Sequence, residues 1–376
     1  MNTVWTDNAR TLVVKIGTGL LGGEKPFEGR HLEAVVKDLA RLKRERGTNI
    51  IVVSSGAIGC GMSRLGLTDR PKVLPLKQAT AAVGQATLMH YYGTLFRTYG
   101  EGLETAQVLL TASDLDNRQT YLNVRNTLKA LLDLGNVVPI VNENDSTATD
   151  ELKFGDNDTL AAKIAAKADA DLLIILTDVD GLYDGNPAQD PSATLITKVD
   201  TIDAEIEKFA EDTSRATSTG GMKTKLDAAK IACAAGLVTI IANGCRPNII
   251  PDLLAGTAPC TTFGASHEVL SHRKRWIAFG RAVQGALRVD EGARNAIVLS
   301  GKSLLATGIT AVEGKFKAGS AVRLVDAHGT AIARGLVNYS SEDIHRIKGR
   351  KSAEIAGILG RKDFDEVIHR DNLVVL

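Results

Sequence analysis

The sequence of 376 residues has few cysteines and no long apolar run. Its cysteines, Cys60, Cys233, Cys245 and Cys260, have neither the paired spacing of a zinc site nor the density of a disulfide scaffold, and are interpreted as small apolar residues. No apolar run approaches the roughly 20 residues that cross a bilayer. Residues 1–10 are polar and lack the pattern of a secretory signal. We therefore expect a cytoplasmic protein.

Charge is divided unevenly along the chain. The net charge is +1, but residues 270–376 carry 18 Lys and Arg against 11 Asp and Glu, a balance of +7 that leaves −6 for the rest. A basic module is typical of contact with a polyanion such as RNA. Surface charge also drifts without function, so RNA binding is one of two interpretations of this segment.

Length and hydrophobic pattern favour two domains. Residues 11–270 alternate short apolar runs with helical stretches, which predicts βαβ units and a largely parallel sheet. From Trp276 onward, short alternating segments punctuated by glycine predict a small β-rich domain. We place the α/β domain at residues 9–265, a linker at 266–280 and the β-rich domain at 281–365.

Five β-rich runs matter most for function, because ligands of parallel sheets bind beyond the carboxyl ends of the strands. These runs are Thr11–Ile16, Asn49–Val53, Asn136–Val141, Asp171–Leu176 and Val238–Ala242. The residues that follow them are the site candidates.

The turn after the first run is rich in glycine. Gly17 to Gly22 formally matches the G-x-G-x-x-G fingerprint of dinucleotide-binding proteins. However, no apolar-periodic helix follows directly, and the second strand ends at Ser54-Ser55 without an acidic residue for a ribose. We therefore favour a phosphate-facing turn with Lys15 beside it over a dehydrogenase.

Polar residues cluster after the next strands. Ser55 begins a strand-to-helix turn, and two segments, Asn142 to Asp145 and Gly155 to Asp158, hold more acids and amides than a turn requires. Such clusters bind cations, here an α-ammonium group, magnesium or a catalytic lysine. The alternative is an Asx-rich loop without function.

Two later segments favour a nucleotide. Thr177 and Asp178 end an apolar strand, and Thr219 to Lys225 places two glycines and two lysines before a predicted helix at Leu226–Ala235. The Walker A pattern G-x-x-x-x-G-K-[ST] is absent from the sequence, so we do not predict a P-loop fold.

In this order the motifs resemble those of the amino acid kinase family, and within it the glutamate 5-kinases. The resemblance covers residues 11–263. Its motifs are Lys15 to Thr18, Ser55 to Ile58, Asn142 to Asp145, Gly155 to Asp158, Leu176 to Asp178, Gly181 to Tyr183, Thr219 to Met222, and Lys225. Further on, Arg273 to Ile277, Val289 to Ala293, Lys302 to Leu305 and Gly335 to Ser341 resemble the PUA domain that many of these kinases carry.

The resemblance implies an open αβα sandwich of eight strands and a reaction in which ATP phosphorylates the side-chain carboxylate of L-glutamate. It assigns catalytic roles to Lys15, Lys225 and Asp158 and glutamate binding to Ser55, Asp145 and Asn157. ATP would contact Lys15, Thr177, Asp178, Thr219, Gly220, Gly221, Met222, Lys223, Thr224 and Lys225. Mg²⁺ is implied because nucleotide phosphates carry it; no metal-ligating residue of the protein itself is predicted.

Several partners follow from the resemblance alone: proline as a feedback inhibitor, glutamate-5-semialdehyde dehydrogenase as the next enzyme of proline biosynthesis, and a homo-oligomer of two or four chains. Two alternatives stay open. One is a kinase of the same fold for N-acetylglutamate, aspartate or a nucleoside monophosphate. The other is an RNA-binding or RNA-modifying protein that acts through the PUA domain.

Overall fold

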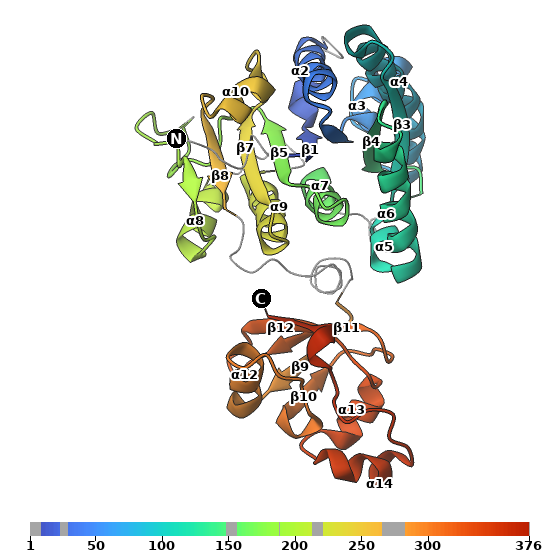
Figure 1. Cartoon of the computed structure of the whole chain (residues 1–376), viewed down its shortest axis with the longest axis vertical. Helices are drawn as coiled ribbons and strands as arrows, with labels where there is room; N and C mark the ends of the chain where they lie inside the picture. The colour runs from blue at the N-terminus through green and yellow to red at the C-terminus, as the bar shows by residue number, and fades with distance from the viewer. Residues whose placement is uncertain are drawn as a thin grey trace. The chain divides into compact units, whose positions relative to one another are not determined.

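The computed structural model describes residues 9–22, 29–147, 156–187, 189–212, 221–264 and 283–375. It divides into two compact units, Met1–Val269 and Leu270–Leu376 (Figure 1). The linker predicted at residues 266–280 lies outside the described residues. The domain boundaries given above therefore stay predictions.

The first unit is built on an eight-stranded sheet with the strand order β3-β4-β2-β1-β5-β7-β8-β6. Its strands are β1 (Thr11–Ile16), β2 (Asn49–Ser54), β3 (Glu104–Leu110), β4 (Val137–Glu143), β5 (Leu172–Thr177), β6 (Lys198–Val199), β7 (Val238–Asn243) and β8 (Cys260–Phe263). Only the pairing of β7 with β8 is antiparallel within this sheet. The largely parallel sheet is therefore confirmed, and the five predicted runs all form strands.

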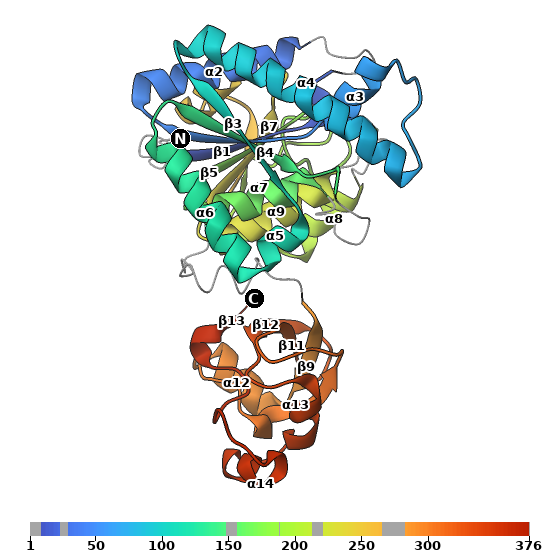
Figure 2. The same ribbon diagram turned by 90° about the vertical axis from the view of Figure 1, so that its right-hand side faces the viewer.

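Helices cover both faces of this sheet, as Figures 1 and 2 show. One layer contains α2 (Arg30–Arg46), α3 (Ala57–Leu65), α4 (Leu74–Gly100) and α10 (Ile249–Ala255). The other contains α5 (Ala112–Asp116), α6 (Arg118–Asp133), α7 (Asn157–Lys167), α8 (Ala204–Asp212) and α9 (Met222–Ala234). The two faces have separate apolar cores, so the predicted αβα sandwich is confirmed.

Strand alternation decides which core each residue of β1 joins. Leu12, Val14 and Ile16 pack in the core with α2, α4 and α10. Val13 packs in the core with α6, α7 and α9. Lys15 has the same parity as Val13, and its side chain therefore faces the α7 and α9 layer.

The second unit has its own core around a five-stranded sheet of order β10-β9-β11-β12-β13. Its elements are β9 (Gly285–Val289), α12 (Glu291–Val298), β10 (Ile309–Glu313), β11 (Ala321–Val325), β12 (Ala331–Leu336), α13 (Ser341–Ile347), α14 (Ile355–Leu359) and β13 (Leu373–Val375). The predicted β-rich character is confirmed. None of the helices in the described part of the chain combines the length and apolar character needed to cross a membrane.

Candidate active site

The topology brings two helix N-termini to the carboxyl edge of the large sheet. The helices α7 and α9 each lead into the next parallel strand, β5 and β7, so each helix begins where the strands end. The two helices pack against each other, and α7 also packs against β1. The partial positive charges of two helix N-termini thus lie beside the end of β1, where an anion is stabilised.

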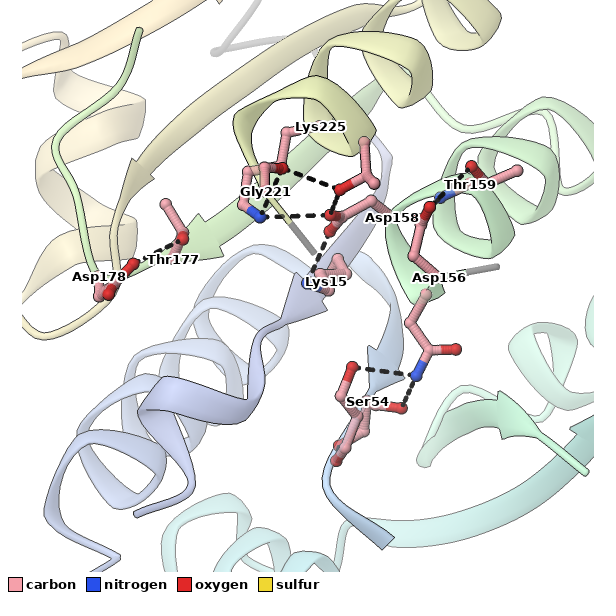
Figure 3. A network of polar contacts seen from close by, with 12 residues as sticks. Lys15, Ser54, Asp156, Asp158, Thr159, Thr177, Asp178, Gly221 and Lys225 are labelled. Atoms are coloured by element: carbon pink, nitrogen blue, oxygen red, sulfur yellow. Dashed lines mark hydrogen bonds and ion pairs between the residues drawn. The ribbon is translucent and has the colours of Figure 1, made fainter. Parts of the chain in front are cut away.

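Two lysines and one aspartate form the centre of this edge (Figure 3). Lys15 Nζ lies 2.6 Å from Asp158 Oδ1, and Lys225 Nζ lies 3.3 Å from Asp158 Oδ2. The Thr224 hydroxyl lies 2.9 Å from Asp158 Oδ2 as well. All three charged side chains are at least nine-tenths buried. The structure therefore unites the three predicted catalytic residues, which come from β1, α7 and α9.

Burial and charge act in opposite directions on the pKa values of this group. Burial opposes ionisation of Asp158, but Lys15, Lys225 and the hydrogen bonds outweigh it and hold the Asp158 pKa below its ordinary value. Burial lowers the pKa of Lys225, and the Asp158 carboxylate counteracts that effect. A carboxylate that stays ionised and paired is a poor general base. In this arrangement one carboxylate contacts two ammonium groups.

The glycine-rich turn after β1 lies next to the end of β5. Gly17 N–H donates to Leu176 O at 3.2 Å, and a Cβ on Gly17 would lie 3.6 Å from Lys15 Nζ. Thr177 and Asp178 follow at the end of β5, with a 3.1 Å contact between the Thr177 hydroxyl and Asp178 Oδ1. The turn forms a short 3₁₀ helix, Thr18–Leu20, and α2 begins only at Arg30, which agrees with our rejection of a dinucleotide-binding motif.

Helix α9 begins earlier than the predicted Leu226, because Gly221 is already its N-cap. Lys225 therefore lies in the first turns of the helix, and its ammonium group lies 3.5 Å from Gly221 O at the helix N-terminus. The Met222 side chain is part of the apolar core, so a contact with phosphate would come from its backbone. Lys223 is exposed, and Thr219 and Gly220 lie outside the described residues.

A neutral hydrogen-bond cluster lies beside the charged centre. Asn157 Nδ2 lies 3.0 Å from Ser55 Oγ and 2.9 Å from both Ser54 O and Asn142 Oδ1. Asn142 Nδ2 donates to Gln85 Oε1 at 2.9 Å. The structure thus joins two of the predicted glutamate-binding residues, Ser55 and Asn157.

The third predicted glutamate-binding residue, Asp145, lies half-buried in the turn after β4. Sequence reasoning missed Gln85, because it lies inside the long helix α4 and belongs to no recognisable motif.

A second missed residue, Arg246, connects the loops after β5 and β7. Its Nε and Nη2 donate to the two carboxylate oxygens of Asp180 at 2.9 and 2.7 Å, and these hydrogen bonds hold the Asp180 pKa below its usual range. Beside this pair, Gly244 N–H donates to Thr177 O at 2.9 Å. The two loops that flank Thr177 and Asp178 are therefore fixed to each other.

Comparison with known proteins decides the family. Residues 10–243 match the model of the amino acid kinase family, and residues 285–359 match that of the PUA domain. The chain is 49% identical over 370 residues to a glutamate 5-kinase of Moorella thermoacetica, covering 98% of this chain and 97% of that protein. The chain belongs to the glutamate 5-kinase branch of the amino acid kinase family.

Further relatives agree with this assignment. A glutamate 5-kinase of Thermosynechococcus vestitus is 49% identical over 372 residues, which cover 98% of this chain and 99% of that protein. Among solved structures, carbamate kinase from Giardia lamblia bound to AMP-PNP superimposes with a TM-score of 0.50 at 16% identity, covering 69% of this chain and 99% of that chain. At that identity the likeness shows the fold alone.

Proposed function

We propose that this protein transfers the γ-phosphoryl group of ATP to the side-chain carboxylate of L-glutamate, producing L-glutamyl 5-phosphate and ADP as the first step of proline biosynthesis. The observation that carries the proposal is the pair of buried lysines held on one aspartate at the sheet edge where two helices begin. The identity of the acceptor comes from the relatives, which are glutamate 5-kinases and are similar to this chain over nearly their whole length.

The chemistry needs no general base. A glutamate side chain has a pKa near 4.3, so it is already an anion at neutral pH and attacks the γ-phosphorus directly. One carboxylate oxygen bonds to phosphorus as the bond to the β,γ-bridging oxygen of ATP breaks, and that oxygen leaves with ADP. The barrier is the repulsion between anions together with the charge that spreads over the transferring group.

We infer that Lys15 and Lys225 lower this barrier. Each ammonium group forms an ion pair with one oxygen of the Asp158 carboxylate. Positive charges fixed in advance at a buried site act more strongly than solvated ones and need no reorganisation during transfer. Asp158 acts as a positioning residue, since both of its oxygens are already engaged.

The nucleotide would lie along the turn after β1, the end of β5 and the start of α9. Thr177 and Asp178 are held beside Gly17 to Gly19, and Gly221 to Lys225 form the N-terminus of α9, which favours an anion. We infer that Mg²⁺ arrives with ATP on its phosphate oxygens. Asp158 is not expected to bind it, because the two lysines occupy its carboxylate.

Glutamate would lie between the lysine pair and the neutral cluster of Ser55 and Asn157, with Asp145 at the ammonium group. A carboxylate such as Asp145 can pair with a free ammonium but not with an acetylated nitrogen. Proline shares the ammonium and α-carboxylate of glutamate, so we propose that it inhibits by competing at the same place. Asp145→Asn should then weaken the binding of both compounds together.

The family also suggests partners. We propose a homo-oligomer, a cytoplasmic location shared with ATP and glutamate, and transfer of the labile acyl phosphate to glutamate-5-semialdehyde dehydrogenase. For the PUA domain we favour a regulatory or structural role over RNA binding. If it binds RNA, the affinity should fall steeply with salt, because phosphate contacts release counterions.

Magnesium-dependent ATP turnover tests the proposal directly. ADP formation is measured with L-glutamate, N-acetylglutamate and L-aspartate at matched concentrations, and the acyl phosphate is trapped with hydroxylamine. Glutamate should give a specificity constant at least about 100-fold above that of the acetylated compound, because the acetylated nitrogen carries no positive charge to pair with Asp145. Comparable constants for the two acceptors would contradict the assignment of the substrate.

A further inference from the structure

Three side-chain amides, two of them buried and one, Asn157, half-buried, form a chain beside the proposed glutamate site. Asn157, at the start of α7, lies 2.9 Å from Asn142 Oδ1 on β4, and Asn142 Nδ2 donates at 2.9 Å to Gln85 Oε1 on α4. This amide chain of Gln85, Asn142 and Asn157 connects the two helix layers around the end of β4. Gln85 is only 8% exposed.

Backbone groups show which way each amide of the chain is turned. The Glu143 N–H can only donate, and it lies 2.8 Å from Asn142 Oδ1, so the Asn142 nitrogen must face Gln85. Gln85 must then present its oxygen. At the other end of the chain, Ser54 O can only accept, so the Asn157 atom that lies 2.9 Å from it must be the nitrogen, Nδ2. Each amide orientation therefore follows from its neighbours.

In this arrangement one acceptor and one donor of the amide chain lack a hydrogen-bond partner among the described residues. These atoms are Asn157 Oδ1 and Gln85 Nε2, and both are buried. Buried polar atoms without a partner destabilise a fold and require an explanation. The explanation we favour is a functional site.

The position of Gln85 depends on unusually close packing of α3 and α4. A Cβ on the preceding residue, Gly84, would lie 1.7 Å from Ala57 O, and a Cβ on Gly61 would lie 1.8 Å from Thr80 O. Only glycine allows this approach. The packing brings Gln85 from α4 to the carboxyl end of β4, within reach of Asn142.

We propose that Gln85 is a positioning residue for the glutamate substrate. By accepting from Asn142 Nδ2, it anchors the Asn142 side chain in the orientation that Glu143 N–H also requires, with Oδ1 toward Asn157 Nδ2. Asn157 Oδ1 is then held where it can accept from the substrate ammonium. The inference rests on the proposed function, because it takes the ligand of Asn157 to be glutamate. Gln85 would thus take part in substrate binding from α4, through the amides of Asn142 and Asn157 and without contacting the phosphoryl group.

The test uses the full-length protein and two substitutions at Gln85. Gln85→Met keeps the length of the side chain but removes the acceptor, whereas Gln85→Glu keeps an oxygen for Asn142. Thr80→Val is the matched control. It removes a partly buried hydrogen bond within α4, from Thr80 Oγ1 to Leu76 O at 2.7 Å, and leaves the amide chain unchanged. For each variant we measure kcat, the KM of glutamate and of ATP, and the glutamate-induced shift in Tm.

Gln85→Met should raise the KM of glutamate about tenfold, because Asn142 Nδ2 loses its buried acceptor and the Asn142 side chain then holds Asn157 less firmly. The KM of ATP should stay within about twofold, the glutamate-induced shift in Tm should shrink, and Gln85→Glu should recover most of the wild-type KM. Thr80→Val should lower Tm and leave both KM values unchanged.

Two results would overturn the inference. One is a folded Gln85→Met variant whose KM for glutamate equals that of Thr80→Val. If Gln85→Met does not fold, Gln85→Leu removes the same acceptor with a smaller side chain, and a normal KM for glutamate there is equally decisive.

Failure of the proposed function looks different. In that case the wild-type protein does not phosphorylate glutamate, or Asn157→Ala leaves the KM of glutamate unchanged. An active enzyme in which Asn157→Ala raises this KM but Gln85→Met does not would contradict only the role of Gln85.

Discussion

Asp158→Asn is the most informative single substitution, because it removes the carboxylate that both lysines contact. The side chain is 1% exposed, and its partners Lys15 and Lys225 are 7% and 6% exposed. Removing one partner of a buried ion pair costs roughly 3–5 kcal/mol, mostly through the charge left behind. We expect a clear loss of stability in thermal unfolding. We also expect kcat to fall by about 100-fold or more, since small displacements of catalytic groups have effects of that size.

The pH dependence of kcat distinguishes a specific effect on the lysines from a general loss of stability in Asp158→Asn. Burial lowers the pKa of Lys225, and Asp158 raises it. Without the carboxylate this pKa falls further, so the ammonium loses its proton at lower pH. Activity that needs the charged lysine is lost as the pH rises through that pKa, so the alkaline limb of kcat should move to lower pH. The assay is kcat measured in steps from about pH 6 to pH 10 under saturating substrates.

Asp156→Asn is the matched control. Asp156 caps α7 by accepting from Thr159 N–H at 2.7 Å, and an asparagine can cap a helix equally well. This variant removes a nearby negative charge without removing the contact with the lysines, so its effect on kcat and on the alkaline limb should be much smaller. An Asp158→Asn variant with wild-type kcat and an unmoved alkaline limb would refute the role given to Asp158.

Three further predictions follow from the same structure. Lys15→Ala and Lys225→Ala should each lower kcat by about 100-fold or more while changing the KM of glutamate far less; wild-type kcat in steady-state assays would remove that lysine from the mechanism. Gly56→Ala should cost about 1–3 kcal/mol in denaturant unfolding, because φ is +100° there and a Cβ would lie 2.3 Å from Leu21 Cδ1; an unchanged midpoint would contradict this. A fragment ending at residue 272 should keep glutamate kinase activity, since the described site residues all precede the second unit; a soluble, folded but inactive fragment would show that the PUA domain helps to build the site.

Some features of this protein are fixed by local sequence. The five apolar runs form strands because short β-branched segments between glycine-rich turns suit a buried parallel sheet. Strand alternation alone puts Lys15 on the same face as Val13, and Gly17 leaves room beside its ammonium group. These features depend on neighbours within a few residues. The order of the motifs along the chain was enough to recognise the kinase family.

Other features exist only in the folded chain. Asp158 is 67 residues from Lys225 in the sequence, and no local rule says that both lysines meet one carboxylate rather than separate partners. The strands β3, β6 and β8 were not predicted, because β3 is a partly exposed edge strand, and β6 and β8 are short. Gln85 looks like an ordinary residue of a long helix until Gly61 and Gly84 bring α4 against α3. The charge pairing and the amide chain come from contacts between distant segments, which only tertiary packing determines.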